Sequence, residues 1–191
     1  MKIQLSATLT FLFLLISMNA CAIDYENIQT GRLTGKLIVQ WLEPDVFLFI
    51  PDSNKPLTFT RSNGATLSPG RMITDGGSIP RPMRAFRNYS PWGYAPGFVV
   101  HDWLFRMKHC HLSDYELYNL EEAGLVLAEV MKTMMETNTV EKDATTIKLM
   151  YTAVTSRFAR KYWDADDCRS VPTQIRQNIL QIHLSRMYCI L

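Results

Sequence analysis

The sequence predicts an α+β fold, with a small N-terminal antiparallel sheet, a long ordered loop and a helical C-terminal half of about four helices. Residues 36–73 alternate in polarity and are rich in β-branched and aromatic side chains. From residue 98 onward, apolar residues recur every three or four positions instead, as helices require. The chain has 191 residues, 47% of them hydrophobic and 20% charged, which suits one globular domain with a real core.

Three strands are expected over residues 36–42, 46–50 and 57–61, and a fourth short strand ends at Met72 and Ile73. Turn residues such as Ser62-Asn63-Gly64 fill the intervals between them. Residues 24–35 are expected to form a polar lead-in. Residues 74–97, rich in Gly, Pro, Asn and Ser, are expected to form the long ordered loop.

Four helices are expected, over residues 98–109, 113–137, 141–163 and about 172–188. Leu117 is among the residues expected to give the second helix its apolar surface. The third helix is predicted from one stripe of apolar residues at helical spacing, which should be buried. The stripe consists of Ile147, Met150, Tyr151, Val154, Phe158 and Tyr162.

Residues 1–22 are expected to be a signal peptide, which leaves residues 23–191 as a single globular domain. Lys2 precedes an apolar run over residues 9–18 that is too short to span a bilayer comfortably. Two interpretations of its end stay open. Ala20-Cys21-Ala22 fits an ordinary signal peptidase, whereas Cys21 could instead be lipidated and bring the protein to a membrane surface. The expected location is therefore exported: periplasmic, outer-membrane lipoprotein or secreted.

Cys110, Cys168 and Cys189 remain for the fold, and an oxidising compartment would allow one disulfide. Three pairings are possible. A Cys168–Cys189 bond would fix the C-terminal segment and leave Cys110 over. The net charge of +2, without a long Lys/Arg run, argues against a nucleic-acid partner.

A basic cluster is expected on the third helix. It consists of Lys148, Arg157, Arg160 and Lys161. These side chains could contact an anionic membrane surface. A solvated helix face is the commoner explanation of such a cluster.

The first chemical motif is Thr74-Asp75-Gly76-Gly77-Ser78-Ile79-Pro80. Glycines let the backbone approach a ligand closely, and a carboxylate beside free carbonyl oxygens is a half-site for a hard cation such as calcium. The alternative is a turn, in which Asp75-Gly76 is a common turn dipeptide and Ser78 caps a short helical turn.

The second motif is His101-Asp102-Trp103-Leu104-Phe105-Arg106. Adjacent helical residues point about 100° apart, so one of His101 and Asp102 can face a water while the other faces a metal. A neutral histidine is the usual general base near pH 7. The alternative is structural: Asp102 pairs with Arg106, and His101 is a hydrogen-bonded core residue.

Together the two motifs resemble a phage and bacterial family known as domain of unknown function 1353. The resemblance runs over a motif core at residues 69–163, and it carries over Asp75, Ser78, Pro80, His101 and Asp102. It implies no activity. The family usually has an Ala-Asp pair on the following helix, where this chain has Ala123-Gly124.

A weaker resemblance, to secreted phospholipase A2 enzymes of bacteria and fungi, implies an activity. It makes His101 the base, Asp75 and Asp102 ligands of Ca²⁺, and Glu122 or Glu121 the carboxylate that orients His101. Calcium would polarise an ester carbonyl. Gly77 stands where that family has a disulfide cysteine.

The expected function is an exported envelope hydrolase with a His-Asp site. It would cleave an ester or amide in an envelope lipid or a peptidoglycan-type substrate, and a metal could assist. Ser78 lacks the Gly-x-Ser-x-Gly context of a nucleophile, so it is expected to hold the loop or a substrate oxygen. The alternative is a non-catalytic phage or bacterial envelope binding protein, in which the same residues form a structural polar network. The oligomeric state does not follow from the sequence.

Overall fold

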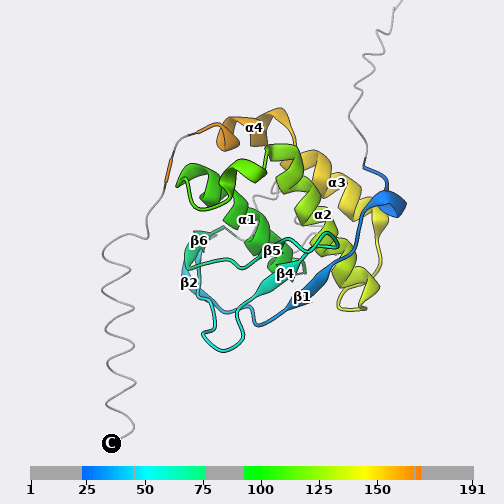
Figure 1. Ribbon diagram of the computed structural model, residues 1–191, viewed down its shortest axis with the longest axis horizontal. Helices are drawn as coiled ribbons and strands as arrows, with labels where there is room; N and C mark the ends of the chain where they lie inside the picture. Colours follow the sequence, from blue (N-terminus) through cyan, green and yellow to red (C-terminus); the bar gives the residue numbers. More distant parts are fainter. Residues whose placement is uncertain (1–22, 45, 76–92, 166, 169–191) are drawn as a thin grey trace, which may run out of the picture.

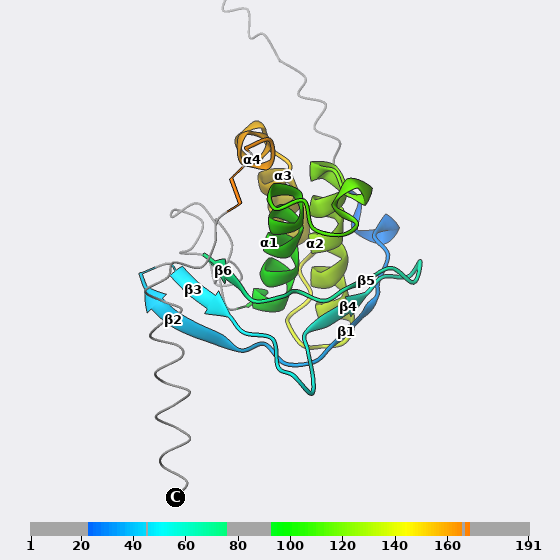
Figure 2. The same ribbon diagram turned by 60° about the vertical axis from the view of Figure 1, so that its left-hand side comes forward.

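The computed structural model describes residues 23–44, 46–75, 93–165 and 167–168, and these residues have the predicted α+β architecture. Short strands between residues 32 and 74 form two antiparallel sheets, and four α-helices follow (Figure 1). In Figure 2 the long helices stand on one side of the strands. The described chain is therefore layered, with the core between sheets and helices.

One sheet has the order β1-β4-β5 and the other β2-β3-β6. Two of the strands, β1 and β5, lie outside the predicted ones. Because they are three and two residues long, they are too short to show an alternating pattern, and β1 lies within the expected polar lead-in. Their bounds are β1 Arg32–Thr34, β2 Val39–Glu43, β3 Val46–Phe49, β4 Thr58–Thr60, β5 Thr66–Leu67 and β6 Met72–Thr74.

The helices are α1 Ala95–His109, α2 Leu120–Glu136, α3 Ala144–Val154 and α4 Arg157–Trp163, with short 3₁₀ turns at η1 Tyr25–Asn27 and η4 Tyr115–Leu117. Pro96 lies in the first turn of α1, where its missing N–H costs nothing. Among the described residues, no helix has the length and apolar character needed to cross a membrane. The predicted helix at 172–188 and the signal peptide at 1–22 lie outside the described residues.

The second helix begins at residue 120, so the predicted start at 113 was wrong. The side chain of Asn119 accepts a hydrogen bond from the backbone N–H of Glu122 and caps the helix there. Leu117 was expected to give this helix apolar surface, but it precedes the cap and is 72% exposed.

The third predicted helix is two helices, because the chain breaks at Thr155 and Ser156. The Ser156 hydroxyl accepts from the N–H of Ala159 and starts α4 in a new direction. The predicted burial of Phe158 and Tyr162 was therefore wrong. Their side chains are 68% and 65% exposed.

The core is centred on α2, which contacts α1, α3 and β1. Side chains from the sheets and all three longer helices contribute to it. The largest fully buried ones are Phe49, Phe59, Leu48, Met72, Leu104, Leu120, Leu127, Met131, Ile147, Val100, Val126 and Val130.

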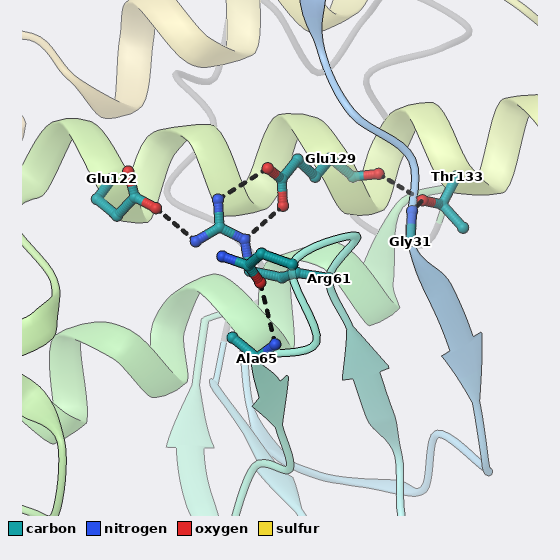
Figure 3. Close-up of polar contacts among 7 residues, drawn as sticks. Gly31, Arg61, Ala65, Glu122, Glu129 and Thr133 are labelled. Atoms are coloured by element: carbon teal, nitrogen blue, oxygen red, sulfur yellow. Dashed lines mark hydrogen bonds and ion pairs between the residues drawn. The ribbon is translucent and has the colours of Figure 1, made fainter.

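Helix α2 also holds the start of the described chain. The Lys132 ammonium is buried and donates to the carbonyl oxygens of Tyr25 and Ile28 at 2.7 and 2.9 Å. The N–H of Gly31 donates to Thr133 Oγ1 at 2.8 Å (Figure 3). These bonds give backbone groups of residues 25–31 partners on a helix far along the sequence.

A disulfide joins Cys110 to Cys168, which is one of the three pairings that the sequence left open and not the Cys168–Cys189 bond considered there. Cys110 caps the C-terminal end of α1, and α4 packs against that end through an edge-to-face contact of Phe105 with Trp163. This packing brings Cys168, shortly after α4, to Cys110. Cys189 lies outside the described residues.

Candidate functional site

The two sequence motifs meet where β6 ends beside α1. Thr74 is the last residue of β6, and its hydroxyl donates to Asp102 Oδ2 at 2.5 Å. Asp75 follows Thr74, and its charge acts on both His101 and Asp102. The structure thus brings together Asp75, His101 and Asp102, while Ser78 and Pro80 lie outside the described residues.

His101 lies in α1 and is 6% exposed. Its Nδ1 is 3.1 Å from the carbonyl oxygen of Ala123 in α2. A carbonyl only accepts, so Nδ1 carries the hydrogen, and Nε2 of the neutral ring holds the lone pair. Burial lowers the pKa of His101 to about 4, against the opposing effects of the Ala123 carbonyl and the Asp75 charge. At neutral pH the imidazole is therefore uncharged and held in one tautomer.

Asp102 behaves in the opposite way. Burial and then the charge of Asp75 raise the pKa of its carboxyl to about 7, although the Thr74 hydroxyl stabilises the ionised form. Asp102 therefore gains or loses its proton near neutrality, which makes it suitable for acid–base chemistry at that pH.

Glu122 does not orient His101. Its carboxylate pairs with the Arg61 guanidinium, which also binds both oxygens of Glu129 at 2.7 and 2.8 Å (Figure 3). The alternative orienter, Glu121, pairs with Arg160 of α4. Both glutamates directly precede Ala123 on α2, but their side chains pair with Arg61 and Arg160 instead of His101. The carbonyl of Ala123 takes the orienting place.

Gly124 stands where the family resemblance led us to expect an aspartate, and it lies against α3. A Cβ atom at Gly124 would lie 2.5 Å from Thr155 Cγ2 and 3.3 Å from the Tyr151 ring. A side chain at position 124 would therefore require the Thr155 side chain or the neighbouring helix to shift.

The structure describes only part of the calcium site that the sequence led us to expect. No three His, Cys, Asp or Glu side chains of these residues are grouped to hold a metal ion. Asp75 and Asp102 supply two carboxylates, and Asp102 is already bonded by Thr74. Calcium takes six to eight oxygen ligands, so an ion held by Asp75 and Asp102 would need further oxygens from elsewhere.

Two parts of the site were not among the predicted site residues. Thr74 was noted in its motif but given no role, although its place directly before Asp75 at a strand end was a usable signal. The Ala123 carbonyl is a backbone group, and no residue type could have marked it.

The family described as "Protein of unknown function (DUF1353)" matches residues 54–154, just over half of the chain. The chain belongs to this family. The DUF1353 region contains both motifs and the Ala123 carbonyl, so it covers the whole candidate site, whereas α4 and Cys168 lie beyond it. No curated protein and no solved structure matches the chain. The resemblance to secreted phospholipases therefore stays an expectation.

Proposed function

We propose that this DUF1353 protein is an exported hydrolase that cleaves an ester or amide of the cell envelope by proton transfer at His101 and Asp102. One observation carries the proposal: a buried imidazole of fixed tautomer lies beside a carboxyl group whose pKa is about 7. Paired groups whose environments separate their pKa values are typical of acid–base sites.

In the proposed reaction, Nε2 of His101 accepts a proton from a water molecule, and the water oxygen attacks the carbonyl carbon. The charge of Asp75 favours the imidazolium that forms. Protonated Asp102 gives its proton to the departing alcohol or amine as the ester or amide bond breaks. His101 then loses the proton it took from water and Asp102 regains one, through solvent, so both groups return to their starting states. Thr74 positions the Asp102 carboxyl through its hydrogen bond.

Export is supported by the Cys110–Cys168 disulfide, because such bonds persist in oxidising compartments, and by the leader-like residues 1–22. The proposed substrates are therefore phospholipid-like esters and peptidoglycan-type amides.

The test compares the full chain with His101→Gln and Asp102→Asn. Three substrates cover the proposed classes: p-nitrophenyl esters, phosphatidylethanolamine vesicles and purified peptidoglycan. Each variant should lower kcat on the cleaved substrate by about 10²–10⁴-fold, the usual contribution of a positioned acid or base. His109→Gln is the matched control, because His109 is on the same helix but bonds the Tyr162 carbonyl of α4.

Asp102 as the acid also sets the pH dependence. Turnover should fall as pH rises through about 7, where the carboxyl loses its proton. Full turnover in His101→Gln on every substrate that the wild type cleaves would reject the proposal. A calcium-dependent rise in Tm that Asp102→Asn abolishes would favour a metal-assisted reaction instead.

A second function is favoured by the hydrogen bonds themselves. Thr74–Asp102 joins β6 to α1, and His101–Ala123 joins α1 to α2, as a structural network in a non-catalytic envelope binding protein would. In that case the variants should lose about 1–3 kcal/mol of stability for each buried group left unpaired, and no substrate should be cleaved.

A further inference from the structure

Two aromatic side chains on α4 are exposed to an unusual degree for their type. Phe158 and Tyr162 are 68% and 65% exposed, and they are four residues apart, on one side of the helix. Burying a Phe or Tyr side chain removes about 150–250 Å² of surface from water, so leaving both exposed forgoes a large stabilisation.

Cations accompany this aromatic pair. Helix α4 contains Arg157, Arg160 and Lys161 and no acidic residue. The Arg160 guanidinium pairs with Glu121, whereas Arg157 and Lys161 are exposed beside the aromatics. The Arg157 guanidinium lies 5.3 Å from the centre of the Phe158 ring.

We propose that Phe158, Tyr162, Arg157 and Lys161 form a docking surface for a bilayer of anionic lipids. Aromatic rings enter the boundary between headgroups and acyl chains, and adjacent cations bind the lipid phosphates. Helix α4 combines exposed rings with cations and has no carboxylate of its own, although the exposed Asp164 caps its C-terminal end. Its rings suit the apolar interior of a bilayer, and its cations suit the negative lipid phosphates. The proposal concerns where the protein binds and is independent of the chemistry at His101.

The position of α4 suits this contact. In Figures 1 and 2 it lies at the opposite end of the molecule from the loop between β3 and β4. The Cys110–Cys168 disulfide and the Phe105–Trp163 contact hold this end of the fold together. A membrane that contacts α4 would therefore bind a helix that is fixed to the rest of the fold.

The experiment measures co-sedimentation of the full chain with two kinds of vesicle. One is phosphatidylcholine alone, and the other is phosphatidylcholine mixed with an equal amount of phosphatidylglycerol. The double variant Phe158→Ser/Tyr162→Ser should lose binding to the anionic vesicles. Arg157→Gln and Lys161→Gln should each weaken it about fivefold, as expected for one cation near an anionic surface. Added salt should weaken it further.

Lys55→Gln is the matched control, since it removes one charge from an exposed residue in the loop between β3 and β4. It should leave binding unchanged. Residues 1–22 are present in every variant, so any contribution they make is common to all. Phe158→Trp provides a local readout. The emission of the added tryptophan, obtained by subtracting the wild-type spectrum, should shift to the blue when anionic vesicles are added.

Three results would overturn the proposal. The first is equal vesicle binding by the wild type and the double serine variant. The second is a blue-shifted emission of the tryptophan in Phe158→Trp before any vesicles are added. Such emission would show that another segment of the chain covers the helix. The third is a dimer in analytical ultracentrifugation that the serine variant dissociates, which would make the face an interface between two copies.

Discussion

At the scale of single residues, His101 and Asp102 are both charged in the unfolded chain near pH 5 and both become neutral when the chain folds. The reference pKa values of 6.5 and 3.8 describe an unfolded chain in which, near pH 5, the histidine is protonated and the aspartate is ionised. In the folded protein the two pKa values are about 4 and about 7, so both groups are neutral at that pH. Each state binds one proton on the pair, and the pair contributes little pH dependence between about 4 and 6.5.

Single variants should expose the two opposing contributions. In Asp102→Asn the lowered pKa of His101 remains, so relative to wild type the stability should rise with pH from about 4 to 6.5, where the unfolded chain binds the extra proton. In His101→Gln the raised pKa of Asp102 remains, so stability should fall from about pH 4 to 7, where the folded protein binds the extra proton.

Urea unfolding across this pH range measures both effects. The limiting slope is about 1.4 kcal/mol per pH unit for one proton. Subtracting the wild-type curve removes the contribution of all other groups. Parallel curves for wild type and both variants would show that the two residues keep their ordinary pKa values in the folded protein.

At the scale of elements, the contact of α2 with α3 depends on Gly124. Gly124→Ala places a methyl group 2.5 Å from Thr155 Cγ2, so we expect a loss of stability despite the gain of about 1 kcal/mol in helix propensity. Thr155→Ser removes that methyl group while keeping a hydroxyl to bond the Tyr151 carbonyl.

A double-mutant cycle tests this contact by thermal and urea unfolding. Gly124→Ala should be better tolerated when it is combined with Thr155→Ser than in the wild-type background, with a coupling energy of about 0.5–3 kcal/mol. Additive effects of the two substitutions would show that the helices separate by other means.

The ion pairs of Arg61 attach the loop after β4 to α2. The Arg61 and Glu129 side chains are 9% and 5% exposed, whereas Glu122 is 33% exposed. Glu129→Gln leaves a buried guanidinium without its doubly bonded carboxylate and should cost about 3–5 kcal/mol. Glu122→Gln is the internal control and should cost about 1 kcal/mol or less. Similar losses for both would contradict the importance of burial.

The element types could be predicted because periodicity over ten or more residues reports which face is buried. The helix boundaries depended on single capping residues, Asn119 at the start of α2 and Ser156 at the start of α4. The break between α3 and α4 was not predicted because the apolar spacing continues across Ser156. Strand β1 could not be found because its partner β4 lies about 25 residues away. The site motifs were visible as residue types, but the hydrogen bond of His101 to a backbone carbonyl was not.

At the scale of the whole molecule, the Cys110–Cys168 bond closes a loop with a sequence separation of 58. A closed loop of this length stabilises the fold by about 4 kcal/mol through the lost entropy of the unfolded chain. Cys110→Ser and Cys168→Ser should therefore lower the unfolding free energy equally, and the double variant should be no worse than either. Unequal losses in urea unfolding would indicate that one thiol has a separate packing role.

The attachment of residues 25–31 to α2 also bears on the order in which the chain can assemble. Ile28 and Lys132 are 104 residues apart, and Gly31 and Thr133 are 102 apart. Because the chain is synthesised from its N-terminus, residues 25–31 cannot form these hydrogen bonds until most of the sequence has been made. Such long-range closure slows folding. The order of synthesis and the order of docking are therefore opposite: the first described segment to be made is among the last that can complete its hydrogen bonds.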